Sequence, residues 1–522
     1  MTPALPPIPT AQKAADSIVA WRSIAPALSE LLAAGLSPAD AALRWGLELL
    51  KANQNGDAAT VFRAAAALRP DDAALWTNLG VALDRTQESA PAAACLTRSL
   101  ELQPHQPDTW LLLGIIRGKL GDLDGAEAAY RAALEQQPDS AAAWQCLALV
   151  KEQQRDYAAA IDCLGASIAL GQNSAAIYAN LGKLYYQTGR PEQAHDAYER
   201  AVRDEPGNRH YERMFRKARF LRDMMIGASV EGALGAYQPQ PEPLGEEEEK
   251  ERIAWLEAAA GMLSGWGYAE PAIRICQKQL EMQPGSASAR YLLDVLGGAA
   301  HIIRAPEDYI VETFDTFAEG FDAQLVGVLG YDVPQKLCDL IRTALGVAAA
   351  LTPAQPPLEN ALDAGCGTGL CGPLLRPLSR GLVGVDLSPR MLEMAERRGV
   401  YDELVRAELI DFLATRPGLF DAIVAADVLL YLGDLAPLFL QSARALRPGG
   451  LLALSTELLP EEGHEGFAVL PSGRFAHQTR YVLAMARKDF LLERCLETTL
   501  RLDARGRLTG NLFLFRRRPT SP

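Results

Sequence analysis

The stretch ALDAGCGTGL, residues 361–370, places Gly365, Gly367 and Gly369 directly after a short apolar run that ends in Asp363. Glycine has no Cβ, so it tolerates positive φ and lets another group approach the backbone closely. Three glycines at every second position therefore predict a loop that lies against a ligand. A glycine loop alone does not identify that ligand.

The segments around this stretch alternate between apolar strands and amphipathic helices. Strands are expected at residues 358–365, 381–387, 403–409, 420–427 and 449–457. This alternation predicts a doubly wound parallel sheet with helices on both faces. Ligands bind such sheets at the carboxyl ends of the strands, where residues 363–369 are expected to lie.

Nicotinamide-binding enzymes also carry a glycine loop, but three features point elsewhere. The spacing is D-x-G-x-G-x-G, and Asp386, at the end of the second expected strand, follows Gly369 by 17 residues. Residues 490–518, FLLERCLETTLRLDARGRLTGNLFLFRRR, predict two long strands joined by a turn. A terminal antiparallel hairpin of this kind is foreign to the nicotinamide-binding sheet.

Five motifs follow one another in a fixed order: LDAGCGTG, GVDLSPRML, AELIDFL, FDAIVAADVLLYL and ALRPGGLLALSTE. With the hairpin, they make residues from about 305 to 518 resemble a class I S-adenosylmethionine-dependent methyltransferase. FDTFAEGFDAQLVGVLGYDVP upstream and PSGRFAHQTRYV downstream further resemble a bacterial group in which tetratricopeptide repeats precede the methyltransferase domain. The resemblance implies a Rossmann-like, seven-stranded sheet with a C-terminal antiparallel hairpin, and S-adenosylmethionine as the cofactor.

The resemblance also implies roles for single residues. Gly365, Gly367 and Gly369 would lie against the methionine part of the cofactor, and Asp363 would orient the loop and the cofactor's amino group. Asp386 would accept both ribose hydroxyls, since a carboxylate offers two acceptor oxygens. The other expected contacts are Leu387 and Met391 beside the adenine, Glu408 near its amino group, Leu409 through its backbone, Asp427 at the methionine end and Tyr431 on the next loop. Phe314 and Phe321 could close over the cofactor as a lid or could be ordinary core.

The acceptor end of the site rests on fewer residues. ADVLLY follows the fourth strand, where NPPY would signal an amide or exocyclic amine acceptor. A carboxylate acceptor needs no general base, whereas a hydroxyl or a protonated amine does. His477 is the candidate base, with a loop-fixing role as its alternative, and Tyr481 is a second candidate catalytic residue. Arg474 either binds an acidic group of the acceptor or pairs with the segment LLPEEGHE, residues 458–465.

A period of 34 residues runs through the chain upstream, from about residue 39 to residue 208. It relates Pro70, Pro104, Pro138 and Pro206; the aromatic residues Trp76, Trp110, Trp144 and Tyr178; and Ala58, Ala92, Ala126, Ala160 and Ala194. Three position sets in one register resemble the tetratricopeptide repeat, whose unit is two antiparallel helices. Proline closes each unit because it cannot continue a helix.

Five segments are therefore expected. They are an N-terminal helical cap (1–38), five repeats (39–208), a helix with a Pro/Gly/acidic linker (209–252), a degenerate repeat with a capping helix (253–300) and the methyltransferase domain (301–522). The fold class is an all-α solenoid followed by an α/β domain.

Composition excludes several other classes. A formal net charge of -14 argues against broad binding to nucleic acid, which needs a dense basic face. The N-terminus does not read as a signal peptide, and no apolar run is long enough to span a membrane. The eight cysteines form no C-x-x-C pair, so neither a metal site nor a disulfide framework is expected, and the predicted location is cytoplasmic.

The repeats raise the question of a partner. The concave face of such a solenoid commonly binds an extended peptide. Asn78 and Asn180 occupy groove-facing positions, although asparagine is also the consensus residue there. The predicted function is methyl transfer to a protein or peptide recruited by the repeats. One alternative is a small-molecule methyltransferase whose repeats mediate assembly only, which includes possible homo-oligomers. The other is a catalytically silent cofactor-binding scaffold, but the intact Asp363, glycines and Asp386 argue against it.

Overall fold

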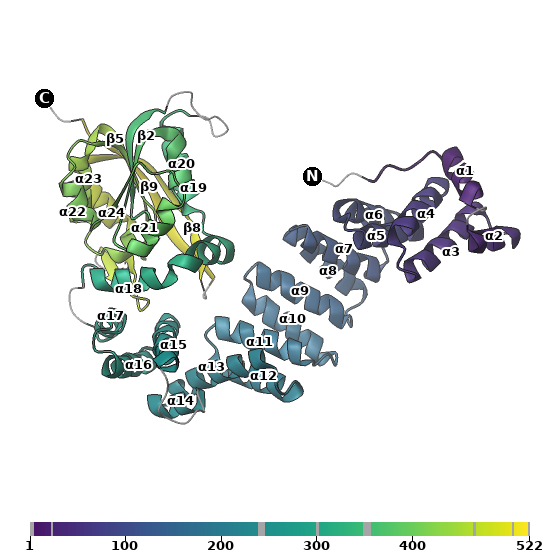
Figure 1. Ribbon diagram of the computed structural model, residues 1–522, viewed down its shortest axis with the longest axis horizontal. Helices are drawn as coiled ribbons and strands as arrows, with labels where there is room; N and C mark the ends of the chain where they lie inside the picture. The colour runs from purple at the N-terminus through teal and green to yellow at the C-terminus, as the bar shows by residue number, and fades with distance from the viewer. Residues whose placement is uncertain are drawn as a thin grey trace. The chain divides into compact units, whose positions relative to one another are not determined.

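A computed structural model shows how the two predicted architectures are built (Figure 1). The chain divides after Phe215 into two units, which are described separately below. The described residues are 5–21, 25–237, 246–298, 302–347, 356–462, 466–503 and 506–519. Within them, no helix is both long and apolar enough to cross a membrane.

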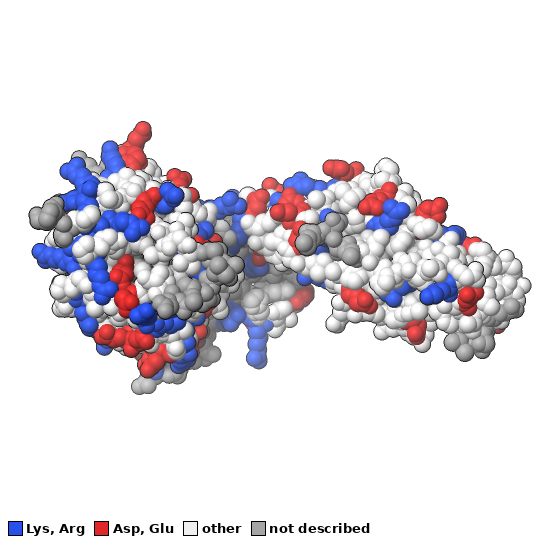
Figure 2. Space-filling view, turned by 90° about the horizontal axis from the view of Figure 1, so that it is seen from above, with Lys and Arg blue, Asp and Glu red and all other residues white. Residues whose placement is uncertain are grey.

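The first unit is a series of antiparallel helix pairs stacked side by side (Figure 1). Its helices are α1 (Ala11–Trp21), α2 (Pro26–Ala33), α3 (Pro38–Lys51), α4 (Asn55–Leu68), α5 (Ala73–Arg85), α6 (Ser89–Leu102), α7 (Pro107–Lys119), α8 (Leu123–Gln136), α9 (Ala141–Gln153), α10 (Tyr157–Ala169), α11 (Ala175–Gln187) and α12 (Pro191–Asp204). Lys and Arg side chains are interspersed with Asp and Glu on the solenoid face seen in Figure 2.

The 34-residue period returns in the backbone. A residue with left-handed φ ends the first helix of each pair, at Asn53, Gln87, Gly121, Arg155 and Gly189. Each indole of Trp76, Trp110 and Trp144 donates a hydrogen bond of 2.8–3.0 Å to the carbonyl oxygen of the proline six residues earlier. The repeat-closing proline thus both stops one helix and receives the next repeat's aromatic residue.

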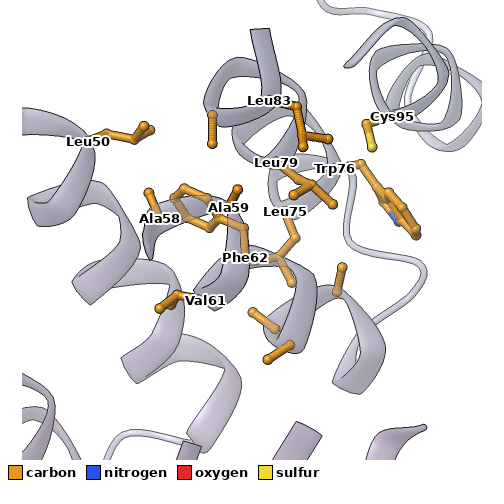
Figure 3. Close-up of a cluster of buried hydrophobic side chains, with 14 of the residues drawn as sticks. Leu50, Ala58, Ala59, Val61, Phe62, Leu75, Trp76, Leu79, Leu83 and Cys95 are labelled. Atoms are coloured by element: carbon orange, nitrogen blue, oxygen red, sulfur yellow. The ribbon is translucent and has the colours of Figure 1, made fainter. Parts of the chain in front are cut away.

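The solenoid core is filled both within a helix pair and where one pair meets the next (Figure 3). Phe62 of α4 is fully buried and lies close to Gly46 of α3, where a Cβ would come within 2.6 Å of its ring. The periodic alanines Ala58, Ala92, Ala126, Ala160 and Ala194 are all fully buried. Small residues at these positions let paired helices approach closely. Because every repeat needs this close approach, alanine recurs there with the 34-residue period.

The second unit begins with helices that precede the sheet in the chain. They are α13 (Arg209–Met225), which spans the division, α14 (Val230–Tyr237), α15 (Glu246–Gly265), α16 (Ala269–Met282) and α17 (Ala287–Leu296). The predicted degenerate repeat corresponds to α15 and α16, with Ala272 fully buried. Residues 238–245 of the predicted linker and residues 299–301 at the predicted domain boundary lie outside the described residues. That boundary stays a prediction.

The sheet confirms the predicted fold class. Its strands are β1 (Leu358–Ala364), β2 (Ser379–Asp386), β3 (Glu403–Arg406), β4 (Phe420–Ala425), β5 (Leu446–Leu458), β6 (Phe467–Val469), β7 (Phe475–His477), β8 (Phe490–Asp503) and β9 (Gly506–Arg517). Strands β3-β2-β1-β4-β5 are parallel, and the β8–β9 hairpin joins β5 antiparallel through β9. The short β6–β7 pair was not predicted; it extends the sheet from Glu457 and Leu458 at the carboxyl end of β5.

Helices cover both faces of this sheet (Figure 1). On one face, α22 (Leu409–Ala414), α23 (Ala436–Ala445) and α24 (Thr479–Ala486) pack around Phe420 and Phe513. On the other, α19 (Val333–Ala344) and α20 (Gly372–Leu375) pack against Leu382 and Leu514. The remaining elements are α18 (Glu307–Phe317), η1 (Ala318–Gly320), η2 (Ala323–Val328), η3 (Arg376–Leu378), α21 (Pro389–Glu396) and η4 (Leu429–Tyr431).

Candidate active site

The glycine loop follows β1 and turns at three residues with left-handed φ: Gly365 (66°), Gly367 (53°) and Gly369 (85°). Side chains are costly in this conformation, so glycine is the expected residue. A Cβ on Gly365 would lie 2.4 Å from the Val428 side chain, whereas one on Gly367 would meet open space. All three glycines thus allow the left-handed backbone of the loop, but the space around each of them differs.

A cavity of about 280 Å³ opens at the carboxyl ends of the parallel strands. Ten of the eleven predicted cofactor contacts line it: Asp363, Gly365, Gly367, Asp386, Leu387, Met391, Glu408, Leu409, Asp427 and Tyr431. Gly369 does not; a Cβ there would lie 3.0 Å from the side chains of Arg398 and Tyr401. Glycine at this position leaves space for the Arg398 and Tyr401 side chains. A sequence motif does not show whether such space is filled by the protein or by a ligand.

Two aspartates at the carboxyl ends of adjacent strands accept hydrogen bonds beside the loop, and one of them bonds to the loop itself. Asp386 Oδ2 accepts a hydrogen bond from the Gly367 amide at 2.8 Å, and Asp386 Oδ1 accepts one from Ser388 N at 2.9 Å. Asp363 Oδ2 accepts a 2.6 Å hydrogen bond from the Tyr401 hydroxyl. Burial raises the pKa of both carboxyl groups, that of Asp363 to about 7. Both groups are therefore poised to gain from a cationic or hydrogen-bond-donating ligand.

Glu408 caps α22, because its Oε2 accepts a 2.8 Å hydrogen bond from Asp411 N. Burial raises the pKa of this carboxyl group, which also lines the cavity. Leu387, Met391 and Leu409 add apolar surface beside it. This part of the cavity therefore combines an apolar wall with one carboxyl group that can accept hydrogen bonds.

The opposite end of the cavity holds a chain of charges. Arg501 of β8 pairs with Asp427 and, at 2.5 Å, with Glu457 of β5. Glu457 Oε1 also lies 3.2 Å from Arg474 Nε. Two carboxylates and two guanidinium groups thus alternate, with Asp427, Arg474 and Arg501 lining the cavity.

Comparisons with known proteins agree with this geometry. A family model described as a methyltransferase domain matches residues 362–454, which run from the end of β1 through the glycine loop into β5. Three tetratricopeptide-repeat models match residues 43–107, 107–150 and 139–203. The chain joins tetratricopeptide repeats to a methyltransferase domain.

Individual relatives cover less. Methyltransferase-like protein 27 of Homo sapiens is 39% identical over 92 residues, which are 17% of this chain and 34% of that protein. The chain thus matches about a third of this curated relative's length. NodS, an N-methyltransferase from Bradyrhizobium japonicum WM9 solved with S-adenosyl-L-homocysteine, has a TM-score of 0.27 and 20% identity, covering 35% of this chain and 86% of its own. The tetratricopeptide-repeat protein YrrB has a TM-score of 0.27 and 18% identity over 38% of this chain and 97% of its own.

His477, predicted as a general base, does not line the cavity of the methyltransferase domain. Its imidazole is fully buried, and Nε2 donates a 2.8 Å hydrogen bond to the carbonyl oxygen of Leu432. Burial lowers its pKa to about 4, so it is neutral near pH 7. These contacts tie His477 to the loop after β4 and favour the loop-fixing alternative, while its role as a general base stays a prediction.

Tyr481 is also set apart from the cavity. Its hydroxyl accepts a 3.0 Å hydrogen bond from Leu435 N and donates one of 3.2 Å to Asp434. These bonds give Tyr481 a structural role in the same loop, and its catalytic role stays a prediction. Arg474 does line the cavity, and it pairs with Glu457 of β5 instead of the segment 458–465, of which residues 463–465 lie outside the described residues.

The segment before α19 forms part of the cavity wall. Phe314, Phe321 and Leu325 line it from α18 to η2, which fits both the predicted lid and an ordinary core role. Two carboxylates tie this segment down: Asp315 accepts a 2.6 Å hydrogen bond from Ser388, and Asp322 accepts one of 2.5 Å from Thr368 in the glycine loop. Neither these ties nor the cavity-lining residues Tyr331 and Arg501 were predicted, because no local pattern marks them.

Proposed function

We propose that the methyltransferase domain uses S-adenosylmethionine and methylates an acidic acceptor on a protein or peptide recruited by the solenoid. The observation that carries the proposal is the cavity at the strand ends, where the glycine loop, Asp363, Asp386 and Glu408 converge. The small-molecule alternative remains the competing outcome of the experiment below.

The residues present fit this cofactor. Gly365 and Gly367 form a cradle without Cβ atoms, and Asp363 is the buried carboxylate that would receive the cofactor's amino group. Asp386 would accept the ribose hydroxyls, and the apolar wall of Leu387 and Met391 suits a flat aromatic ring. When bound, S-adenosylmethionine supplies an activated methyl group, so the protein's main task is to position the acceptor.

The acceptor end favours an acceptor that needs no deprotonation. Among the described cavity-lining residues there is no histidine or lysine, and Asp427, the lining carboxylate at this end, is paired with Arg501. Burial raises the pKa values of the Tyr331 and Tyr431 hydroxyls, which makes them poor bases near neutral pH. A carboxylate is already ionised and nucleophilic near neutral pH, and the Arg474 guanidinium group would bind it. We therefore propose a carboxylate as the acceptor group.

The surface of the solenoid suits a partly apolar peptide. Three polar side chains of the solenoid already have partners: Asn78 donates to Ala74 O at 2.8 Å, Arg85 donates to Leu50 O at 3.1 Å, and Lys183 pairs with Glu152. Leu149 of α9, by contrast, is 58% exposed. Recognition would therefore rest on apolar contacts more than on a clamp of free charges.

The test is incubation of the full chain with radiolabelled S-adenosylmethionine and cell extract. Label in protein supports the proposal, and label only in small molecules supports the alternative. Release of protein-bound label as methanol in mild base would identify a carboxylate ester, since methylated amines do not hydrolyse. Base-stable label would overturn the carboxylate acceptor.

A further inference from the structure

A tight turn delivers Arg474 to the cavity. Residues 470–474 connect β6 to β7, and the turn is closed by hydrogen bonds from Gly473 N to Leu470 O at 2.8 Å and from Leu470 N to Arg474 O at 2.7 Å. Gly473 has a φ of 76°. Because Gly473 immediately precedes Arg474, any shift of this turn also moves the guanidinium group.

Two hydroxyl groups from outside the sheet hold the turn. Tyr291 Oη of α17 donates a 2.8 Å hydrogen bond to the carbonyl oxygen of Gly473. Ser264 Oγ of α15 donates to the carbonyl oxygen of Pro471. Tyr291 is 3% exposed and Ser264 is fully buried, so both bonds are shielded from water. The turn is thus anchored by the degenerate repeat and its capping helix.

Aromatic packing completes this anchor. The rings of Tyr291 and Tyr309 lie 4.5 Å apart, and a Cβ on Gly473 would come within 3.1 Å of the Tyr291 ring. Glu312 of α18 accepts a 2.9 Å hydrogen bond from Ala287 N at the start of α17. These contacts fix α17 to α18, whose Phe314 lines the cavity.

Arg474 retains binding capacity toward the cavity. Within the described part of the chain its ion-pair partner is Glu457, which lies near its Nε. Its side chain is 29% exposed and lines the cavity. Guanidinium groups bind carboxylates with two parallel N–H donors, and that geometry tolerates little displacement.

We propose that Tyr291 is a positioning residue for the acceptor site: through Gly473 it holds Arg474 where the guanidinium group can receive an acceptor carboxylate. The inference rests on the proposed function. Tyr291 itself does not line the cavity, so it acts only through the turn. It follows that helices preceding the methyltransferase domain hold the turn that carries Arg474 of the acceptor site.

The experiment compares the variants Tyr291→Phe and Arg474→Gln with the double variant that carries both changes. The control is Tyr198→Phe, which removes the hydroxyl of a buried tyrosine in α12. Ser264→Ala breaks the second anchor and serves as the independent variant if Tyr291→Phe does not fold. Three quantities are measured on the full chain: label transfer from S-adenosylmethionine into extract protein, affinity for S-adenosylhomocysteine, and hydrogen exchange of the amides of Leu470 and Gly473.

Loss of one positioning hydrogen bond is expected to lower transfer about tenfold at limiting extract. Affinity for S-adenosylhomocysteine should be unchanged, the two turn amides should exchange faster, and Tyr291→Phe should cost nothing further in the Arg474→Gln background. Unaltered exchange in the turn would overturn the proposal, as would an additional loss in that background or a parallel loss of cofactor affinity. If the unmodified chain neither binds S-adenosylhomocysteine nor transfers label, the proposed function fails, while amide exchange still decides whether Tyr291 holds the turn.

Discussion

The Tyr401 hydroxyl donates a 2.6 Å hydrogen bond to Asp363 at the carboxyl end of β1, where the carboxyl group is 1% exposed. Burial outweighs this bond and raises the pKa of Asp363 from 3.8 to about 7. The carboxylate that the sequence predicts for the cofactor's amino group is therefore costly to ionise in the free protein.

The first prediction follows from that pKa. Between about pH 4 and about pH 7 the folded chain keeps a proton on Asp363 that the unfolded chain has lost, so Asp363 makes stability fall as pH rises through this window. The expected slope is at most about 1.4 kcal/mol per pH unit. Urea unfolding of the unmodified chain and of Asp363→Asn, at several pH values, isolates the contribution as the difference between the two. A difference that does not change with pH would contradict the assignment.

The second prediction concerns Asp386. Asp386→Asn should weaken S-adenosylhomocysteine binding by about 1–3 kcal/mol, because donors that met a carboxylate would lose a partner. Asp421→Asn is the matched control: Asp421 accepts hydrogen bonds from two backbone amides, Glu359 N at 2.8 Å and Asn360 N at 2.9 Å, but does not line the cavity. Calorimetry should show a loss of affinity only for the Asp386 variant. Equal losses would mean that general damage explains the effect.

The third prediction compares two solenoid glycines that both face open space. Gly121 lies two residues after the end of α7 and has a φ of 78°, whereas Gly165 lies inside α10, and a Cβ on either would meet nothing within 4 Å. Gly121→Ala should destabilise the solenoid by about 1 kcal/mol, since an L side chain is strained at positive φ. Gly165→Ala should stabilise it by about 1 kcal/mol through helix propensity. Thermal unfolding shifts of the same sign would refute the backbone explanation.

Local patterns made much of this chain predictable. The 34-residue period depends on residues that pack within one repeat or against the next, such as Phe62 on Gly46. The glycine loop and Asp386 are likewise tied to the ends of neighbouring strands, so their juxtaposition follows from the parallel order of the sheet.

The acceptor end could not be predicted in the same way. Arg501 reaches Asp427 only because the β8–β9 hairpin returns along β5, and the sequence does not specify that register. His477 and Arg474 lie three residues apart, yet Arg474 lines the cavity while His477 is buried against the loop after β4. Whether a residue in or beside a short strand faces the ligand depends on tertiary contacts.

The final prediction concerns the shared carboxylate of Glu457, which is 2% exposed and pairs with both Arg501 and Arg474. Arg501→Met removes the cation between Asp427 and Glu457 and leaves buried charge uncompensated, so it should destabilise the second unit by about 3–5 kcal/mol. Adding Glu457→Met removes one of the orphaned charges, and the double variant should lose less than the sum of the two single variants by about 1–3 kcal/mol. Urea unfolding of the three variants measures this coupling. Additive losses would show that Arg501 and Glu457 stabilise the domain independently, and the alternating charge chain would then have no energetic meaning.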